Sequence, residues 1–113
     1  MEKDFVGIVL YDIQLNGHLN GVYANNQSPT LNRILTETAR FINSVTDTSG
    51  RIINRYDVFY FDGENGHRGE LRLVFNEDRT IRAFWIVNNE EWFNGLGFQM
   101  NDRQIAIYYN PSN

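Results

Sequence analysis

Residues 51–109 read RIINRYDVFYFDGENGHRGELRLVFNEDRTIRAFWIVNNEEWFNGLGFQMNDRQIAIYY and contain five strand-length runs in succession. The segments between the runs are DGENGH, NEDR, NNE and ND, which are polar and rich in turn-forming residues. Within runs such as ELRLVF and RQIAIYY, apolar and polar side chains alternate, as they do in a half-buried strand. The turns are too short to hold a crossover helix, so neighbouring runs are predicted to pair antiparallel.

Two more strands and one helix are predicted before this meander. Residues 5–15 form the first predicted strand, NGHLNG supplies a hairpin turn, and residues 21–25 form a short second strand. Ser28 suits a helix N-cap and Pro29 suits the first helical position. We therefore expect a helix over residues 29–43, whose apolar face has helical spacing. That face consists of Leu31, Ile34, Leu35, Thr38, Phe41, Ile42 and Val45.

The predicted fold is mainly β with one α-helix, in which the antiparallel meander forms a strongly curved sheet or a small barrel. Closure of a sheet removes exposed strand edges, and a helix can cover one end. Gly95 and Gly97 fall inside a predicted strand, where glycine permits a bend or the close approach of another backbone. The length of 113 residues predicts a single domain over residues 1–113.

Residues 82–109 resemble the C-terminal meander of small calycin-type barrels, the lipocalin and avidin-like group. A Trp-bearing strand precedes a strand of the form F-x-G-x-G, and the last strand ends in aromatic residues. The matching residues are Trp85, Phe93, Gly95, Gly97, Ile105, Ile107 and Tyr109, and Gly21-Val22-Tyr23 is similar to the G-x-Y of an early strand. The resemblance implies a calycin-like barrel of a bacterial family that binds a small molecule in its interior. The predicted helix departs from the avidin order, and no residue set matches a biotin or haem site.

Composition excludes several classes of protein. The net charge of −4 and the scattered arginines do not suit nucleic acid, whose backbone requires clustered basic residues. The absence of cysteine excludes disulfides and thiolate metal sites. The opening MEKDFVGIVLYD is too acidic, and its apolar run too short, for a signal peptide or a membrane span. We therefore expect a cytoplasmic protein of bacterial type that binds neither nucleic acid nor membrane.

No catalytic, cofactor or metal motif stands out. The two histidines, His18 and His67, lie in glycine-containing turns, and their spacing does not match a metal site. There is no nucleophile elbow and no phosphate-binding glycine loop. We expect no cofactor. An enzyme that uses Asp57, Glu70 or a loop histidine is the least supported of the functions considered.

Aromatic residues on the meander strands are the most informative functional feature. Ligand pockets are mostly apolar and aromatic with a few placed polar groups, and they usually enclose at least about 300 Å³. The same rings are also needed to fill a core, so both roles are considered. The candidate ligand-binding residues are Tyr56, Tyr60, Trp85, Trp92, Phe98, Arg55 and Arg82. Because side chains alternate along a strand, only one face can be correct, and we favour the face of Tyr56, Tyr60 and Trp85.

The leading hypothesis is a non-enzymatic binder of a small, partly apolar or aromatic ligand inside the barrel. The alternative is an acidic protein-interaction module, for example one that binds a protein partner or a toxin. An exposed aromatic patch outside the barrel would favour this alternative.

Overall fold

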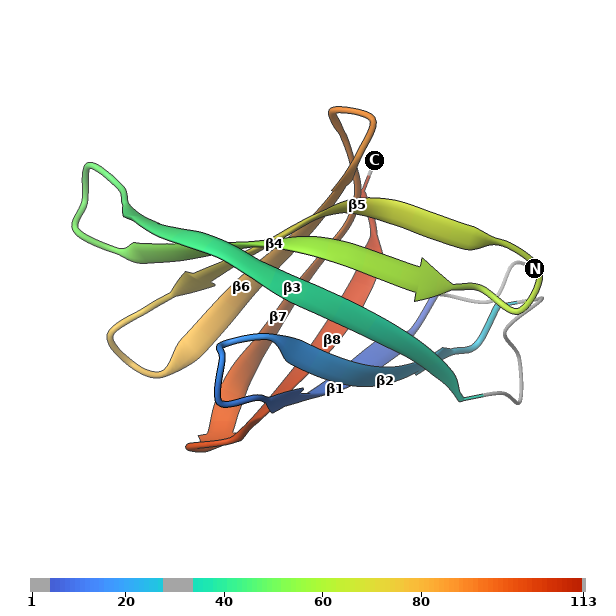
Figure 1. Ribbon diagram of the computed structural model, residues 1–113, viewed down its shortest axis with the longest axis horizontal. Coiled ribbons are helices and arrows are strands. Elements are labelled where there is room, and N and C mark those ends of the chain that lie inside the picture. Colours follow the sequence, from blue (N-terminus) through green and yellow to red (C-terminus); the bar gives the residue numbers. More distant parts are fainter. Residues whose placement is uncertain (1–4, 28–33, 113) are drawn as a thin grey trace.

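The computed structural model, which describes residues 5–27 and 34–112, is a closed barrel of eight antiparallel strands (Figure 1). Each strand pairs with the next along the chain, and β8 pairs with β1 to close the barrel. The strands are β1 (Gly7–Ile13), β2 (Leu19–Asn25), β3 (Leu35–Thr46), β4 (Ile52–Phe61), β5 (Gly66–Phe75), β6 (Thr80–Val87), β7 (Glu90–Asn101) and β8 (Gln104–Pro111). The prediction of an antiparallel meander closed into a small barrel is confirmed.

The prediction of one α-helix is wrong, because residues 35–46 form strand β3 between β2 and β4. Leu35, Glu37 and Ala39 are buried and alternate with exposed residues, which is the pattern of a strand. Two features concealed this pattern in the sequence. One inward position is a carboxylate, and a register shift between Phe41 and Asn43 breaks the alternation.

Parts of the helix prediction lie outside the described residues, namely Ser28, Pro29 and Leu31. Phe41, which was assigned to the apolar face of the predicted helix, instead lies half-buried in β3. Its ring meets that of Tyr56 edge-on, with 5.7 Å between the ring centroids. Residues 5–27 and 34–112 contain no helix that is long and apolar enough to cross a membrane.

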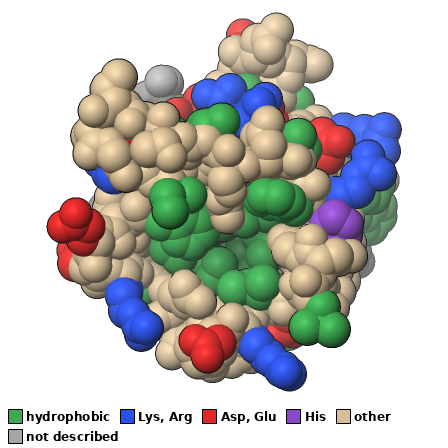
Figure 2. Space-filling model, turned by 60° about the vertical axis from the view of Figure 1, so that its left-hand side comes forward, with side chains coloured by type: hydrophobic (Ala, Val, Ile, Leu, Met, Phe, Trp, Pro, Cys, Tyr) green, Lys and Arg blue, Asp and Glu red, His purple; other side chains and the backbone are tan. Residues whose placement is uncertain are grey.

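The connections alternate between the two ends of the barrel. The turn end carries the β1–β2, β3–β4, β5–β6 and β7–β8 turns. The terminal end carries the other three connections and lies where β1 begins and β8 ends. Figure 2 brings the turn end forward and shows a hollow in which hydrophobic side chains gather. Ile13, Phe41 and Phe75, which are half-buried, pack against the core.

The middle of the barrel is filled with apolar side chains. Their inward direction follows from strand alternation, and each is at most 2% exposed. These residues are Val9, Tyr11, Leu19, Ala39, Val58, Leu71, Leu73, Ile81, Ala83, Ile105 and Ile107. The barrel is therefore packed through its centre, and any ligand site has to lie toward one end.

Gly95 and Gly97 lie where β7 approaches β8 closely. A Cβ atom at Gly97 would be 1.9 Å from the carbonyl oxygen of Ala106, and one at Gly95 would be 2.3 Å from that of Tyr108. Both distances are far below van der Waals contact, and both obstacles are backbone atoms. The predicted close backbone approach at these glycines is confirmed.

Replacing Gly97 with Val is expected to destabilise the barrel by roughly 3 kcal/mol, because the β7–β8 pair must separate to admit the side chain. Leu96→Val, at an exposed position of the same strand, is the matched control and should change stability little. Urea denaturation of both variants measures the difference. Equal stability of Gly97→Val and the parent would show that the close approach is not needed.

Candidate functional site

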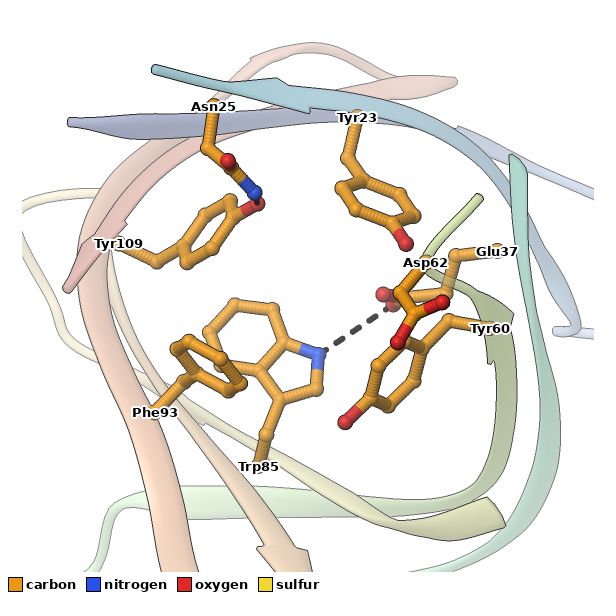
Figure 3. Close-up of a pocket in the computed structure, with 8 residues that line it drawn as sticks. All are labelled: Tyr23, Asn25, Glu37, Tyr60, Asp62, Trp85, Phe93 and Tyr109. Atoms are coloured by element: carbon orange, nitrogen blue, oxygen red, sulfur yellow. Dashed lines mark hydrogen bonds between the residues drawn. The ribbon is translucent and has the colours of Figure 1, made fainter. Parts of the chain in front are cut away.

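A cavity of about 80 Å³ lies at the terminal end of the barrel (Figure 3). Strands β2, β3, β4, β6, β7 and β8 each contribute at least one lining side chain, and the residue after β4 adds one more. The lining residues are Tyr23, Asn25, Glu37, Tyr60, Asp62, Trp85, Phe93 and Tyr109. The half-buried Asn25, Asp62 and Phe93 place its mouth at the surface.

Glu37 lies at the base of the cavity and is only 5% exposed. Its Oε2 accepts hydrogen bonds from the Tyr11 hydroxyl and from Nε1 of Trp85, the latter at 3.4 Å. Among the described residues, no hydrogen bond is made to its Oε1. Burial raises the pKa of Glu37 to about 7, although the two hydrogen bonds oppose the shift. Near neutral pH, Glu37 is therefore a mixture of the neutral acid and the carboxylate.

Three tyrosines line the cavity, and the hydrogen bonding of their hydroxyl groups differs. The Tyr23 hydroxyl donates to the carbonyl oxygen of Phe61, and Nδ2 of Asn25 donates to the Tyr109 hydroxyl at 3.2 Å. The Tyr60 hydroxyl is buried and has no hydrogen-bond partner among the described residues. Burial raises the pKa of Tyr60 and of Tyr109 to about 12, so both are neutral phenols near neutral pH.

Ring contacts hold the walls of the cavity in place. Tyr23 and Tyr60 meet edge-on at a centroid distance of 6.2 Å. On the other side, Tyr109 contacts Trp85 at 5.4 Å and Phe93 at 5.6 Å. Such contacts stabilise each ring beyond its area burial, which favours a pre-formed pocket.

Asp62 forms part of the rim. Its carboxylate accepts hydrogen bonds from the backbone amides of Glu64 and Asn65 and is 2.8 Å from Nε2 of His67. These bonds lower the pKa of Asp62 to about 2, so it is ionised near neutral pH. The His67 ring stacks on Tyr60 at 5.0 Å and also contacts Trp92, which is 37% exposed.

The structure places Tyr56, Tyr60 and Trp85 on the inner face of the barrel, the face favoured from the sequence. Tyr60 and Trp85 line the cavity. Tyr56 lies toward the turn end, where Nδ2 of Asn54 donates to its hydroxyl at 3.2 Å. The three side chains therefore share a face, but only two of them share this site.

The other candidate residues do not line this cavity. Trp92 contacts His67 beside the rim, and Phe98 is 56% exposed. The guanidinium of Arg55 pairs with Glu70 at 2.8 Å. Arg82 lies over the ring of Phe84 at 5.8 Å, so neither arginine is placed to anchor a ligand in the cavity.

Sequence reasoning missed most of the lining residues, namely Tyr23, Asn25, Glu37, Asp62, Phe93 and Tyr109. Tyr23 and Tyr109 lie in the motifs that resemble calycins. The alternation of side chains along their strands would have placed both on the inner face of the barrel. Glu37 could not be found in this way because its segment was predicted as a helix. The signal in the sequence that could have identified Glu37 was its position between Leu35 and Ala39, where a strand would turn all three side chains to the same face.

The cavity is smaller than the roughly 300 Å³ expected from the sequence. The part of the chain that the structure describes contains no group of three His, Cys, Asp or Glu side chains that could hold a metal ion. Comparison of the chain with protein-family models, with curated proteins and with solved structures gave no match.

Glu37 is expected to make folding stability depend on pH. Its pKa is raised on folding from 4.5 to about 7, so the folded state retains a proton that the unfolded state loses. Stability should therefore fall as pH rises from about 4.5 to 7, by about 3 kcal/mol in total, and then level off.

Denaturation of the wild type and of Glu37→Gln at pH 5 and pH 8 isolates this effect. Gln keeps an acceptor for Tyr11 and Trp85 but does not titrate, so the stability gap between the two proteins should change across this range. Asp57→Asn, at an exposed outer position, serves as the control. A gap that stays constant from pH 5 to pH 8 would contradict a raised pKa at Glu37.

Proposed function

We propose that the protein binds a small, partly apolar molecule in the aromatic cavity at the terminal end of the barrel, without catalysing a reaction. The supporting observation is the Tyr60 hydroxyl, which is buried beside the cavity without a partner among the described residues. Buried polar groups nearly always have a hydrogen-bond partner. A ligand that supplies this partner would bind with its apolar part against the surrounding rings.

Cavity volume limits the size of the ligand. Pockets for drug-sized molecules usually enclose about 300 Å³ or more, whereas this cavity has about 80 Å³. Either the whole ligand is small, or only one end of it enters and the remainder lies at the mouth near Phe93. The cavity does not reach the volume of about 300 Å³ that the hypothesis drawn from the sequence required, so the proposal is restricted to a small ligand or to one end of a larger one.

The barrel architecture supports the same proposal. Eight antiparallel strands in a closed barrel agree with a calycin-type fold, in which one end of the barrel holds the ligand. The close approach at Gly95 and Gly97 occurs in the segment that carries the sequence resemblance. We therefore propose that the protein is a small-molecule binder of the calycin type.

Tyr60→Phe tests the role of the unpartnered hydroxyl. The variant should be as stable as the wild type or slightly more stable, because it removes a buried polar group that lacks a partner. It should bind a hydroxyl-bearing ligand roughly 5- to 10-fold more weakly, the value of one hydrogen bond. Tyr108→Phe, at an exposed position on the outer face, is the matched control and should change neither quantity.

Binding can be followed by the fluorescence of Trp85. Trp92→Phe leaves Trp85 as the single tryptophan of the chain, and its ring adjoins the cavity. Native mass spectrometry of protein purified from its own host identifies any retained ligand, and titration with short-chain alcohols supplies defined probes. An unchanged Trp85 emission with every probe, together with no retained ligand, would contradict the proposal.

A second candidate function, protein interaction, is favoured by an apolar patch on the outer face of β1, β7 and β8. The patch residues are 41–56% exposed and comprise Ile8, Leu10, Leu96, Phe98 and Tyr108. Tyr108 pairs with Ile8 on one side and with Leu96 on the other, so the patch is continuous across the three strands. Continuous exposed apolar surface is typical of interaction sites.

If the patch binds another copy of the chain, the wild type should self-associate and Phe98→Thr combined with Tyr108→Thr should remain monomeric. Light scattering after size exclusion, over a range of concentrations, measures this. Leu15→Thr, at a fully exposed position in the β1–β2 turn, is the control. If the wild type stays monomeric and captures no partner from its host, the interaction function is contradicted.

A further inference from the structure

We propose that the part of the ligand held in the cavity is a small organic cation, a protonated amine whose N–H groups bind Glu37 and Tyr60. The inference rests on the proposed function and specifies its ligand class. Three properties of the cavity support a cation: the sign of its charge, the aromatic nature of its walls and its free hydrogen-bond acceptors.

The two acids among the described lining residues, Glu37 and Asp62, favour a cation. No Lys or Arg is among the lining residues that the structure describes. Glu37 takes part in none of the ion pairs between described residues, so its carboxylate form lacks a cationic partner. A buried carboxylate without a counter-ion is costly, and a bound cation would remove that cost. An anionic ligand would meet repulsion from both acids.

The walls of the cavity also suit a positive charge. Figure 3 shows the rings of Tyr23, Tyr60, Trp85 and Tyr109 around the open space, with Glu37 on one side. The face of an aromatic ring carries partial negative charge and attracts an ammonium group within about 6 Å of its centroid. Aromatic rings around a carboxylate therefore combine attraction for the charge with apolar contacts for the carbon atoms of an amine.

Two oxygen atoms can accept hydrogen bonds from an ammonium group. Both bonds to the Glu37 carboxyl are made to Oε2, and among the described residues none is made to Oε1. The Tyr60 hydroxyl oxygen has no partner in the described part of the chain. A primary ammonium group has three N–H donors, which is enough for both acceptors. The volume of about 80 Å³ suits such a head group, with a short apolar body directed toward Phe93 and the mouth.

Proton linkage follows from this arrangement. The groups that face Glu37 are the hydroxyls of Tyr11, Tyr23, Tyr60 and Tyr109, the indole of Trp85 and the rim carboxylate of Asp62. The tyrosines are neutral and Asp62 is ionised near neutral pH, so among the described lining residues Glu37 is the group that changes charge there. An ammonium ligand binds its carboxylate form, so affinity should rise with pH through about 7 and then level off.

The test compares n-butylamine, protonated throughout the pH range used, with 1-butanol as a neutral probe of similar shape. Isothermal titration calorimetry on the full chain at pH 8, with sodium chloride added to match the amine salt, measures both affinities. We expect the amine to bind at least tenfold more tightly than the alcohol. Glu37→Gln should remove this preference, whereas Asp57→Asn, which removes an acid from the outer face, should retain it.

A second measurement does not depend on any variant. At pH 6, amine binding to the wild type should release close to one proton, seen as a dependence of the measured heat on the ionisation enthalpy of the buffer. Similar affinities for the amine and the alcohol would overturn the cation inference while leaving the proposed function intact. Absence of binding by both probes, together with no ligand retained by protein from its own host, would overturn both. Amine binding without proton release at pH 6 would overturn the assignment of Glu37 as the partner.

Discussion

The pairing of β1 with β8 is the constraint on which the rest of the structure depends. It joins residues near the two ends of the chain, from Gly7 opposite Tyr109 to Asp12 opposite Gln104. Without it the eight strands would be an open sheet with two exposed edges and no enclosed interior. With it, every inward side chain faces the same space, and aromatic residues from five strands meet at one end. Gly7 also makes room for this closure, because a Cβ atom there would lie 2.5 Å from the Tyr109 ring.

The interior combines two kinds of region. Through the centre, small and branched apolar side chains fill the barrel and supply the hydrophobic stabilisation. At the terminal end, a buried acid and several tyrosines replace them, and one hydroxyl has no partner in the described part of the chain. Burying such groups costs stability, and proteins commonly accept this cost at sites that bind other molecules. The hydrophobic packing of the centre offsets this loss of stability, and it closes the inner end of the cavity with well-packed side chains.

Much of the fold could be predicted from the sequence because strand alternation and turn residues are local signals. The strands over residues 80–87 and 104–111 were recognised in this way, as was the inward face shared by Tyr60 and Trp85. Strand β3 was predicted as a helix because Glu37 interrupts its apolar alternation and a bulge follows Phe41. The same residue that concealed the strand lies at the base of the cavity. The error in the fold therefore also explains why Glu37 was missing from the predicted site.

The sequence by itself determined the antiparallel pairing of the meander strands and the inward face that carries Tyr60 and Trp85, and it indicated a bend or a close backbone approach at Gly97. Each of these depends on residues near one another in the chain or on the size of one side chain. Only the tertiary structure decided which inward residues share an end of the barrel. Strand tilt and closure bring Tyr23, Glu37 and Tyr109 together across large sequence separations, while Tyr56 and Tyr60, four residues apart, lie toward opposite ends. The environment of Glu37, and hence its charge near neutral pH, follows from that long-range assembly.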